Sequence, residues 1–81
     1  MEAYLGQTIL FGGTFAMTGW LTCNGQLLPI SEYEALYSIL GTTYGGDGVT
    51  TFALPKLARV GDPERGPQYL ICVDGVYPSR G

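Results

Sequence analysis

The chain has 81 residues, of which 46% are hydrophobic and only 14% charged, and its net charge is −3. The acidic balance and the absence of a basic stripe argue against binding to nucleic acid or insertion into an anionic membrane. No histidine occurs, which removes the commonest general base and zinc ligand. A domain this small hides only about 60% of its unfolded surface, so the apolar excess predicts self-association.

The N-terminal segment has neither the basic stretch nor the apolar run of a secretory signal, and no apolar run approaches the length of a membrane span. We therefore expect the protein to be made in the cytoplasm. Leu5 to Gly13 reads as a strand that ends at paired glycines. In the connector that follows, Phe15 and Met17 are expected to pack inward.

The next segment carries the hairpin signal Asn24-Gly25, which suits a two-residue type I′ turn between Trp20–Cys23 and Gln26–Leu28. Trp20 is the single tryptophan, and we expect it to anchor the core. Stacking on a sugar is the alternative that its aromatic ring leaves open.

A helix is predicted from about Ser31 to Leu40. Ser31 and Glu34 have the spacing of a capping box, with Ser31 as the N-cap. Gly41 is the predicted helix stop. One apolar face is formed by Tyr33, Leu36, Tyr37 and Leu40.

A glycine-rich loop follows the helix and ends at Pro55. Its glycines Gly45, Gly46 and Gly48 can adopt positive φ, so the loop can fold tightly around Asp47. Tyr44 and Phe52 are expected to pin the two ends of the loop to the core. The loop lacks the Gly-Lys-Ser/Thr of a phosphate-binding loop and the carboxylates of a calcium loop, which favours a structural role. Contact with a partner or ligand is the alternative.

The last predicted strand, Gln68 to Val73, is almost entirely apolar, so we expect it to be covered on both faces and to lie beside the first half of the chain. Residues 51–54 form a short extended piece, and a polar connector joins them to this strand. Cys23 and Cys72 are expected to be buried thiols, with a disulfide as the alternative. The sequence predicts a small single α+β domain, in which short strands pack on one helix.

Two runs of residues make the chain recognisable. They closely resemble the phage tail collar domain, which also occurs in microcystin-dependent proteins. The runs are Trp20-Leu21-Thr22-Cys23-Asn24-Gly25-Gln26-Leu27-Leu28-Pro29-Ile30 and Ala35-Leu36-Tyr37-Ser38-Ile39-Leu40-Gly41-Thr42-Thr43-Tyr44-Gly45-Gly46-Asp47-Gly48, with Thr51-Phe52-Ala53-Leu54-Pro55 after them.

The resemblance divides the domain into a collar-like region, residues 1–60, and a connector with a closing strand and tail, residues 61–81. Longer members of the family carry a Gly-, Ser- and Thr-rich stretch before the closing segment, whereas here the short segment Val60 to Gln68 connects the two parts. Lys56 also stands where the family usually has an acid. The chain therefore resembles a minimal collar without the receptor-contacting tip.

The resemblance implies a structural protein of trimeric short tail fibres, located in a phage tail or a phage-like particle. Its partners would be further copies of itself and other tail or particle proteins. No enzymatic activity and no cofactor or metal are expected, because no nucleophile has a base nearby and Glu32 and Glu34 lie on different helix faces. The alternative is a lectin-like glycan-binding module that uses Trp20, Tyr44 and Asp47.

Candidate interface residues are Arg59 and Arg80, in addition to these three. Arg80 follows Pro78, which stiffens the chain, so its guanidinium could pair with a carboxylate, of which Asp47 is the most plausible. A solvated terminal arginine is the alternative. We expect a homo-oligomer, by resemblance a trimer, with the glycine loop or the tail near the subunit contacts.

Overall fold

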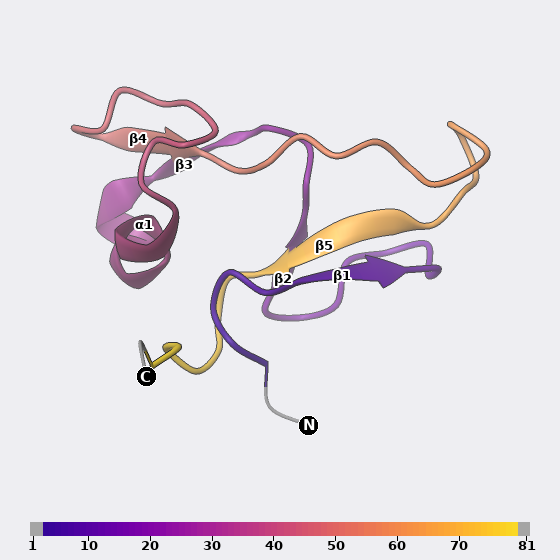
Figure 1. Cartoon of the computed structure of the whole chain (residues 1–81), viewed down its shortest axis with the longest axis horizontal. Coiled ribbons are helices and arrows are strands. Elements are labelled where there is room, and N and C mark those ends of the chain that lie inside the picture. Colours follow the sequence, from indigo (N-terminus) through magenta and orange to yellow (C-terminus); the bar gives the residue numbers. More distant parts are fainter. Residues whose placement is uncertain (1–2, 80–81) are drawn as a thin grey trace.

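The computed structural model describes residues 3–79 and contains two small sheets and one short α-helix (Figure 1). This confirms the predicted small α+β fold. In chain order the elements are β1 (Thr8–Phe11), β2 (Trp20–Thr22), β3 (Leu27–Pro29), the 3-10 helix η1 (Ile30–Glu32), α1 (Glu34–Leu40), β4 (Thr51–Ala53) and β5 (Gln68–Cys72). Within residues 3–79, no helix has the length and apolar character needed to cross a membrane.

The larger sheet has the order β1-β5-β2, with both outer strands antiparallel to β5. Leu10 pairs with Tyr69 and Leu21 with Ile71, so β5 lies between two strands from the first third of the chain. Its last three residues are fully buried, as expected for a central strand with neighbours on both edges. The prediction that this apolar segment lies beside the first half of the chain is confirmed.

The smaller sheet pairs β3 with β4, and Leu28 lies opposite Phe52. Its hydrogen-bond ladder continues beyond the strands: the backbone N–H of Gly25 donates to the Pro55 carbonyl (3.1 Å) and that of Leu57 to the Cys23 carbonyl (2.9 Å). The Cys23 N–H instead donates to the Tyr69 carbonyl of β5 (3.0 Å). Cys23 is therefore the point at which the chain crosses from one sheet to the other.

The predicted hairpin at Asn24-Gly25 is wrong. β2 pairs with β5 and β3 pairs with β4, so the two segments flanking Asn24-Gly25 do not pair with each other. Gly25 does have positive φ (73°), but Asn24 does not, so a type I′ turn is absent. Asn24 instead forms an antiparallel bridge with Lys56.

The predicted start of the helix is also wrong. Pro29, in an extended conformation, is the N-cap of η1, so Ser31 lies inside that 3-10 turn and no side-chain capping hydrogen bond forms. The α-helix has Tyr33 as its N-cap, which places Glu34 at its first residue instead of its third. No capping box forms. Gly41 does end the helix, with φ of 57° and its N–H bonded to the Tyr37 carbonyl.

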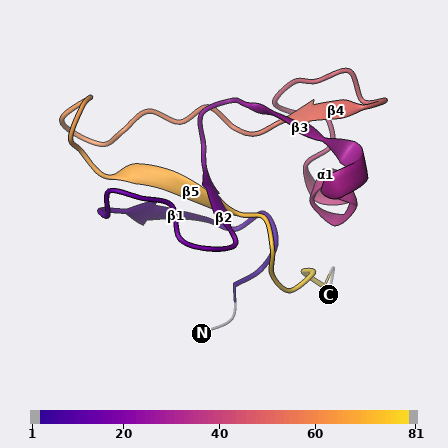
Figure 2. The same ribbon diagram turned by 180° about the vertical axis from the view of Figure 1, so that it is seen from behind.

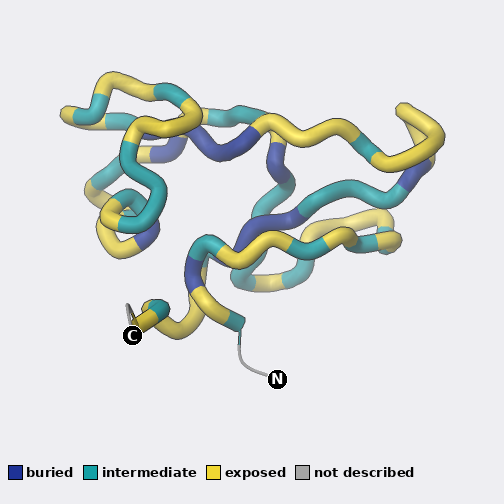
Figure 3. Tube along the Cα trace, viewed as in Figure 1, coloured by how far each residue is buried: buried dark blue, intermediate teal, exposed yellow. Residues whose placement is uncertain are grey.

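The core lies where the two sheets and the helix meet, as the buried segments in Figure 3 show. Each layer contributes: Ile71 comes from β5, Leu28 and Phe52 come from the smaller sheet, and Leu36 comes from α1. Cys23 and Leu54 complete the cluster, and no polar or charged side chain among the described residues is buried. This packing holds the strands and the single helix together as one unit.

The connection between β1 and β2, residues 12–19, passes along the side of the larger sheet away from β3 and β4 (Figures 1 and 2). Phe15 in this connection is 69% exposed, so the expectation that it packs inward is wrong. Its ring makes an edge contact with Phe11, with centroids 6.4 Å apart. Met17 is partly buried. An aromatic pair therefore remains accessible on the outer side of the sheet.

Candidate functional site

The glycine loop between α1 and β4 is held together by the carboxylate of Asp47. Its Oδ1 accepts backbone hydrogen bonds from Val49 (2.8 Å), Thr50 (2.9 Å) and Thr51 (2.9 Å), and its Oδ2 accepts one from the Thr50 hydroxyl (3.0 Å). The N–H groups of Thr51, Val49 and Thr50, in that order, hold the pKa of Asp47 well below its usual range. Asp47 therefore organises its own loop.

Three glycines allow this loop to close. Gly45, Gly46 and Gly48 all have positive φ, as predicted. The Ala53 N–H donates to the Gly45 carbonyl (3.1 Å), and the Tyr37 hydroxyl donates to the Gly48 carbonyl (3.3 Å). These bonds attach the loop to β4 on one side and to α1 on the other.

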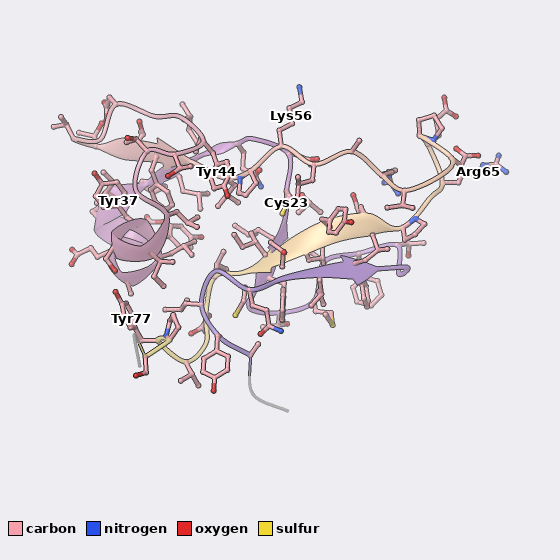
Figure 4. All side chains as sticks on the ribbon, viewed as in Figure 1. Cys23, Tyr37, Tyr44, Lys56, Arg65 and Tyr77 are labelled. Atoms are coloured by element: carbon pink, nitrogen blue, oxygen red, sulfur yellow. The ribbon has the colours of Figure 1, made fainter. Side chains whose placement is uncertain are left out.

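Of the two expected aromatic anchors, only one is buried. Phe52 is completely buried and its ring lies 5.4 Å from that of Tyr37. Tyr44 is 51% exposed, so its expected anchoring role is wrong. Backbone hydrogen bonds hold the loop in place instead, and the Tyr44 ring remains accessible at the surface (Figure 4).

The proposed sugar-binding set is divided between two parts of the fold. Trp20 lies in β2, where it pairs with Cys72 in the larger sheet, and it is only partly buried. Tyr44 and Asp47 lie in the loop that precedes β4 in the smaller sheet. Trp20 and the glycine loop therefore belong to different sheets. Arg80, the proposed partner of Asp47, lies outside the described residues.

A groove of about 550 Å³ lies between the β4–β5 connector and β5. Its walls are Cys23–Asn24, Lys56–Arg59 with Pro63, and Gln68–Tyr69. Lys56 is one of the lining residues; its stem lies against Gly25, and its amine extends into solvent away from β5 (Figure 4). Arg59 is half-buried and donates from Nη1 to the Gly66 carbonyl (2.8 Å). Two basic residues of one short segment therefore line the groove.

The far end of this connector is a tight turn organised by Asp62. Its Oδ1 accepts backbone bonds from Glu64 (2.8 Å) and Arg65 (3.0 Å). These bonds, in that order, together with the charge of Arg59, lower the pKa of Asp62. Arg59 thus bonds to Gly66 and stabilises this turn electrostatically.

Cys23 forms part of the floor of the groove and is only 2% exposed, and burial raises the pKa of its thiol. Cys72 is fully buried in β5, and the two cysteines are not joined. The expected burial of both thiols is confirmed. Within residues 3–79, no group of three histidine, cysteine or acidic side chains comes together as a metal site would require.

Sequence reasoning named Arg59 as a candidate but did not find the groove around it. The groove depends on pairing of residues 23–25 with residues 55–57, which is a long-range contact. One signal was present in the sequence: three of the four basic residues, Lys56, Arg59 and Arg65, fall within one short segment.

Fold and site together define a small α+β domain with a self-contained glycine loop and a basic groove formed by a surface connector. The model of the phage tail collar domain matches residues 6–60, more than half of the chain, and this chain belongs to the phage tail collar domain family. The match includes the glycine loop and the segment from Lys56 to Arg59, but ends before β5. No curated protein and no solved structure matches the chain.

Proposed function

We propose that the chain is a non-enzymatic assembly module of a phage tail fibre or of a phage-derived particle, and that it acts as a homo-oligomer, with three copies favoured. Membership of the collar family supports the tail location. The self-association is inferred from the exposure of large apolar side chains. Among the described residues these are Tyr4, Leu10, Phe15, Leu27, Tyr44, Val49, Leu57, Val60, Val76 and Tyr77.

More large apolar side chains are exposed than is usual for a small soluble monomer. Val49 is 80% exposed at the tip of the glycine loop, and Tyr44 is 51% exposed in the same loop. Single exposed apolar residues are normal on protein surfaces, but several from neighbouring segments mark interaction surfaces. Aromatic residues are enriched in interfaces and charged residues are depleted at their centres. Burial between copies is the arrangement that accounts for this surface.

The second part of the proposal concerns the partners. The chain would contact other tail or particle proteins as well as copies of itself, and family membership supports a location in the virion tail. The microcystin-dependent proteins share the sequence resemblance, so a role in a bacterial particle of phage origin fits the same module. The chemistry proposed is non-covalent: apolar burial and hydrogen bonding across subunit contacts.

Light scattering coupled to size-exclusion chromatography tests the proposal across a wide range of protein concentrations. We expect the mass of a trimer at all but the lowest concentrations. The Tyr44→Ser variant should shift the protein towards monomer while its circular dichroism spectrum remains that of the wild type. A wild-type mass equal to that of one chain at every concentration would contradict the proposal.

A further inference from the structure

The basic residues of this chain are concentrated in one part of the molecule. Residues 3–55 contain the acids Glu32, Glu34 and Asp47 and neither lysine nor arginine. The connector after β4 contains the bases Lys56, Arg59 and Arg65 together with the acids Asp62 and Glu64. Figure 1 shows α1 and the glycine loop at one end of the long axis, and the connector extending to the other end. The molecule is therefore acidic at the helix end and carries its described bases on the connector.

The basic groove has the chemistry to receive an acidic segment. The charged residues among those that line it, Lys56 and Arg59, are both basic, and Lys56 is exposed. Because Nη1 of Arg59 is held by the Gly66 carbonyl, the side chain is already fixed in position. A fixed cation loses less side-chain entropy on binding than a free one. Exposed Leu57 adds an apolar contact beside the two charges.

The helix end has the complementary chemistry. Glu32 and Glu34 are both exposed at the junction of η1 and α1. Exposed apolar side chains accompany them on neighbouring segments, namely Leu27 on β3 and Val49 on the glycine loop. Asp47 is committed to its own loop by four hydrogen bonds and is not needed for the contact.

We propose that the groove between the β4–β5 connector and β5 docks the Glu32–Glu34 end of a second copy of this chain. The inference rests on the self-association proposed above and specifies which surfaces meet. Opposite charges and accompanying apolar groups are present on both surfaces, and the occupant of the groove is accordingly another copy. Such complementarity steers encounter and fixes the register of the contact.

The contact is head to tail, because it joins two different surfaces of each copy. Contacts of this kind close into a ring when the rotation that relates neighbouring copies is a full turn divided by a whole number. A trimer is one such ring. Each copy then uses its helix end once and its groove once.

Charge reversal tests the inference on the full chain, with dissociation constants measured by analytical ultracentrifugation. Lys56→Glu and Glu34→Lys should each weaken self-association by about tenfold or more, since each places like charges together. An equimolar mixture of the two variants should associate more tightly than either variant alone, because the intact groove of one meets the intact helix end of the other. Recovery should be partial, since a ring of three always keeps one contact between two copies of the same variant. The Lys56→Glu/Glu34→Lys double variant should associate more tightly than either single variant.

Arg65→Glu is the matched control, because it makes the same charge change in the same connector but outside the groove. Its effect should be less than about threefold, because Arg65 does not line the groove and its exposed charge is screened by solvent and salt. An equal loss in Arg65→Glu, or no restoration in the mixture, overturns the inference. If the variants keep the wild-type oligomer, only the docking surface is wrong, whereas a monomeric wild type removes the proposed function as well.

Discussion

The backbone of Gly46 lies directly against that of Phe52. A Cβ added to Gly46 would stand 2.4 Å from the Phe52 Cα and 2.7 Å from the Thr51 carbonyl oxygen. Phe52 is completely buried in the core, so the glycine loop rests on an element that cannot move without disturbing the core. The shape of this exposed loop is therefore set by the packing beneath it.

The Gly46→Ala variant should be strongly destabilised. Its φ of +94° is strained for an L-residue, and the contacts are to backbone atoms that cannot rotate away. We expect a loss of roughly 3 kcal/mol or more in unfolding free energy, measured by urea denaturation. Gly61→Ala is the matched control, because φ is +78° there but the added Cβ would meet open space. It should cost only about 1–2 kcal/mol, and equal costs in the two variants would contradict the steric argument.

Phe52→Ala should remove most of the stability of the domain. The ring is fully buried and packs against Tyr37, and such truncations cost about 3–5 kcal/mol. Total stabilities of small domains are only about 5–15 kcal/mol. Thermal melting followed by circular dichroism measures the effect. Phe15→Ala, at a 69% exposed phenylalanine, should change the unfolding free energy by only about 0.5 kcal/mol.

The stability of the protein should fall in acid partly because of Asp47. The folded state lowers the pKa of this carboxyl, so its ionised form stabilises the fold fully above the ordinary value of 3.8. The contribution is lost as the pH falls below that value towards the lower pKa of the folded state. Asp47→Asn should therefore melt at a lower temperature near neutral pH, and the difference from wild type should shrink below about pH 4. A constant difference across this range would contradict the role of the charge.

Two serines on either side of the start of α1 should behave differently on replacement by alanine. Ser31→Ala should leave the unfolding free energy within about 0.5 kcal/mol of wild type, because Ser31 makes no capping bond. Ser38→Ala should cost about 1 kcal/mol, since its hydroxyl bonds to the Ala35 carbonyl (2.6 Å) and the Tyr77 hydroxyl (2.7 Å). A cost of about 1 kcal/mol in Ser31→Ala, typical of a lost cap, would restore the predicted capping box.

Neither cysteine should react with a thiol reagent while the protein is folded. Cys23 and Cys72 are 2% and 0% exposed, and burial raises the pKa of Cys23, which disfavours its reactive thiolate. Labelling should appear only as denaturant unfolds the chain. The mass of the intact protein should correspond to two free thiols after exposure to air. A quantitative disulfide in that measurement would contradict the prediction.

Sequence reasoning was most accurate where local chemistry decides the structure. Gly41 ends the helix because its positive φ is compatible with few other residues, and the glycine loop folds back for the same reason. The apolar run from Gln68 to Cys72 predicted a covered strand, which is the centre of the larger sheet. In each case a few neighbouring residues contain the deciding information.

Sequence reasoning failed where contacts between distant segments of the chain determine the structure. Asn24-Gly25 has the composition of a hairpin turn, yet the flanking segments pair with β5 and β4 instead. Cys23 between them bonds to Tyr69 of β5 and to Leu57 in the connector after β4. Pro29 starts a 3-10 turn because the Ile30 N–H is held by the Thr50 carbonyl (2.9 Å), which moves the helix start beyond Ser31. The basic groove was missed because it needs the same long-range pairing.

The position of β5 between β1 and β2 has a consequence for synthesis. Thr8 pairs with Ile71 and Leu21 also pairs with Ile71, so β1 and β2 are held together only through a strand made much later. Until residues 68–72 leave the ribosome, both N-terminal strands have open edges and the apolar residues meant for the core remain accessible. Unpaired edges of this kind are prone to aggregate. A chain stalled before β5 should therefore depend on chaperones, and a chain released after β5 should not.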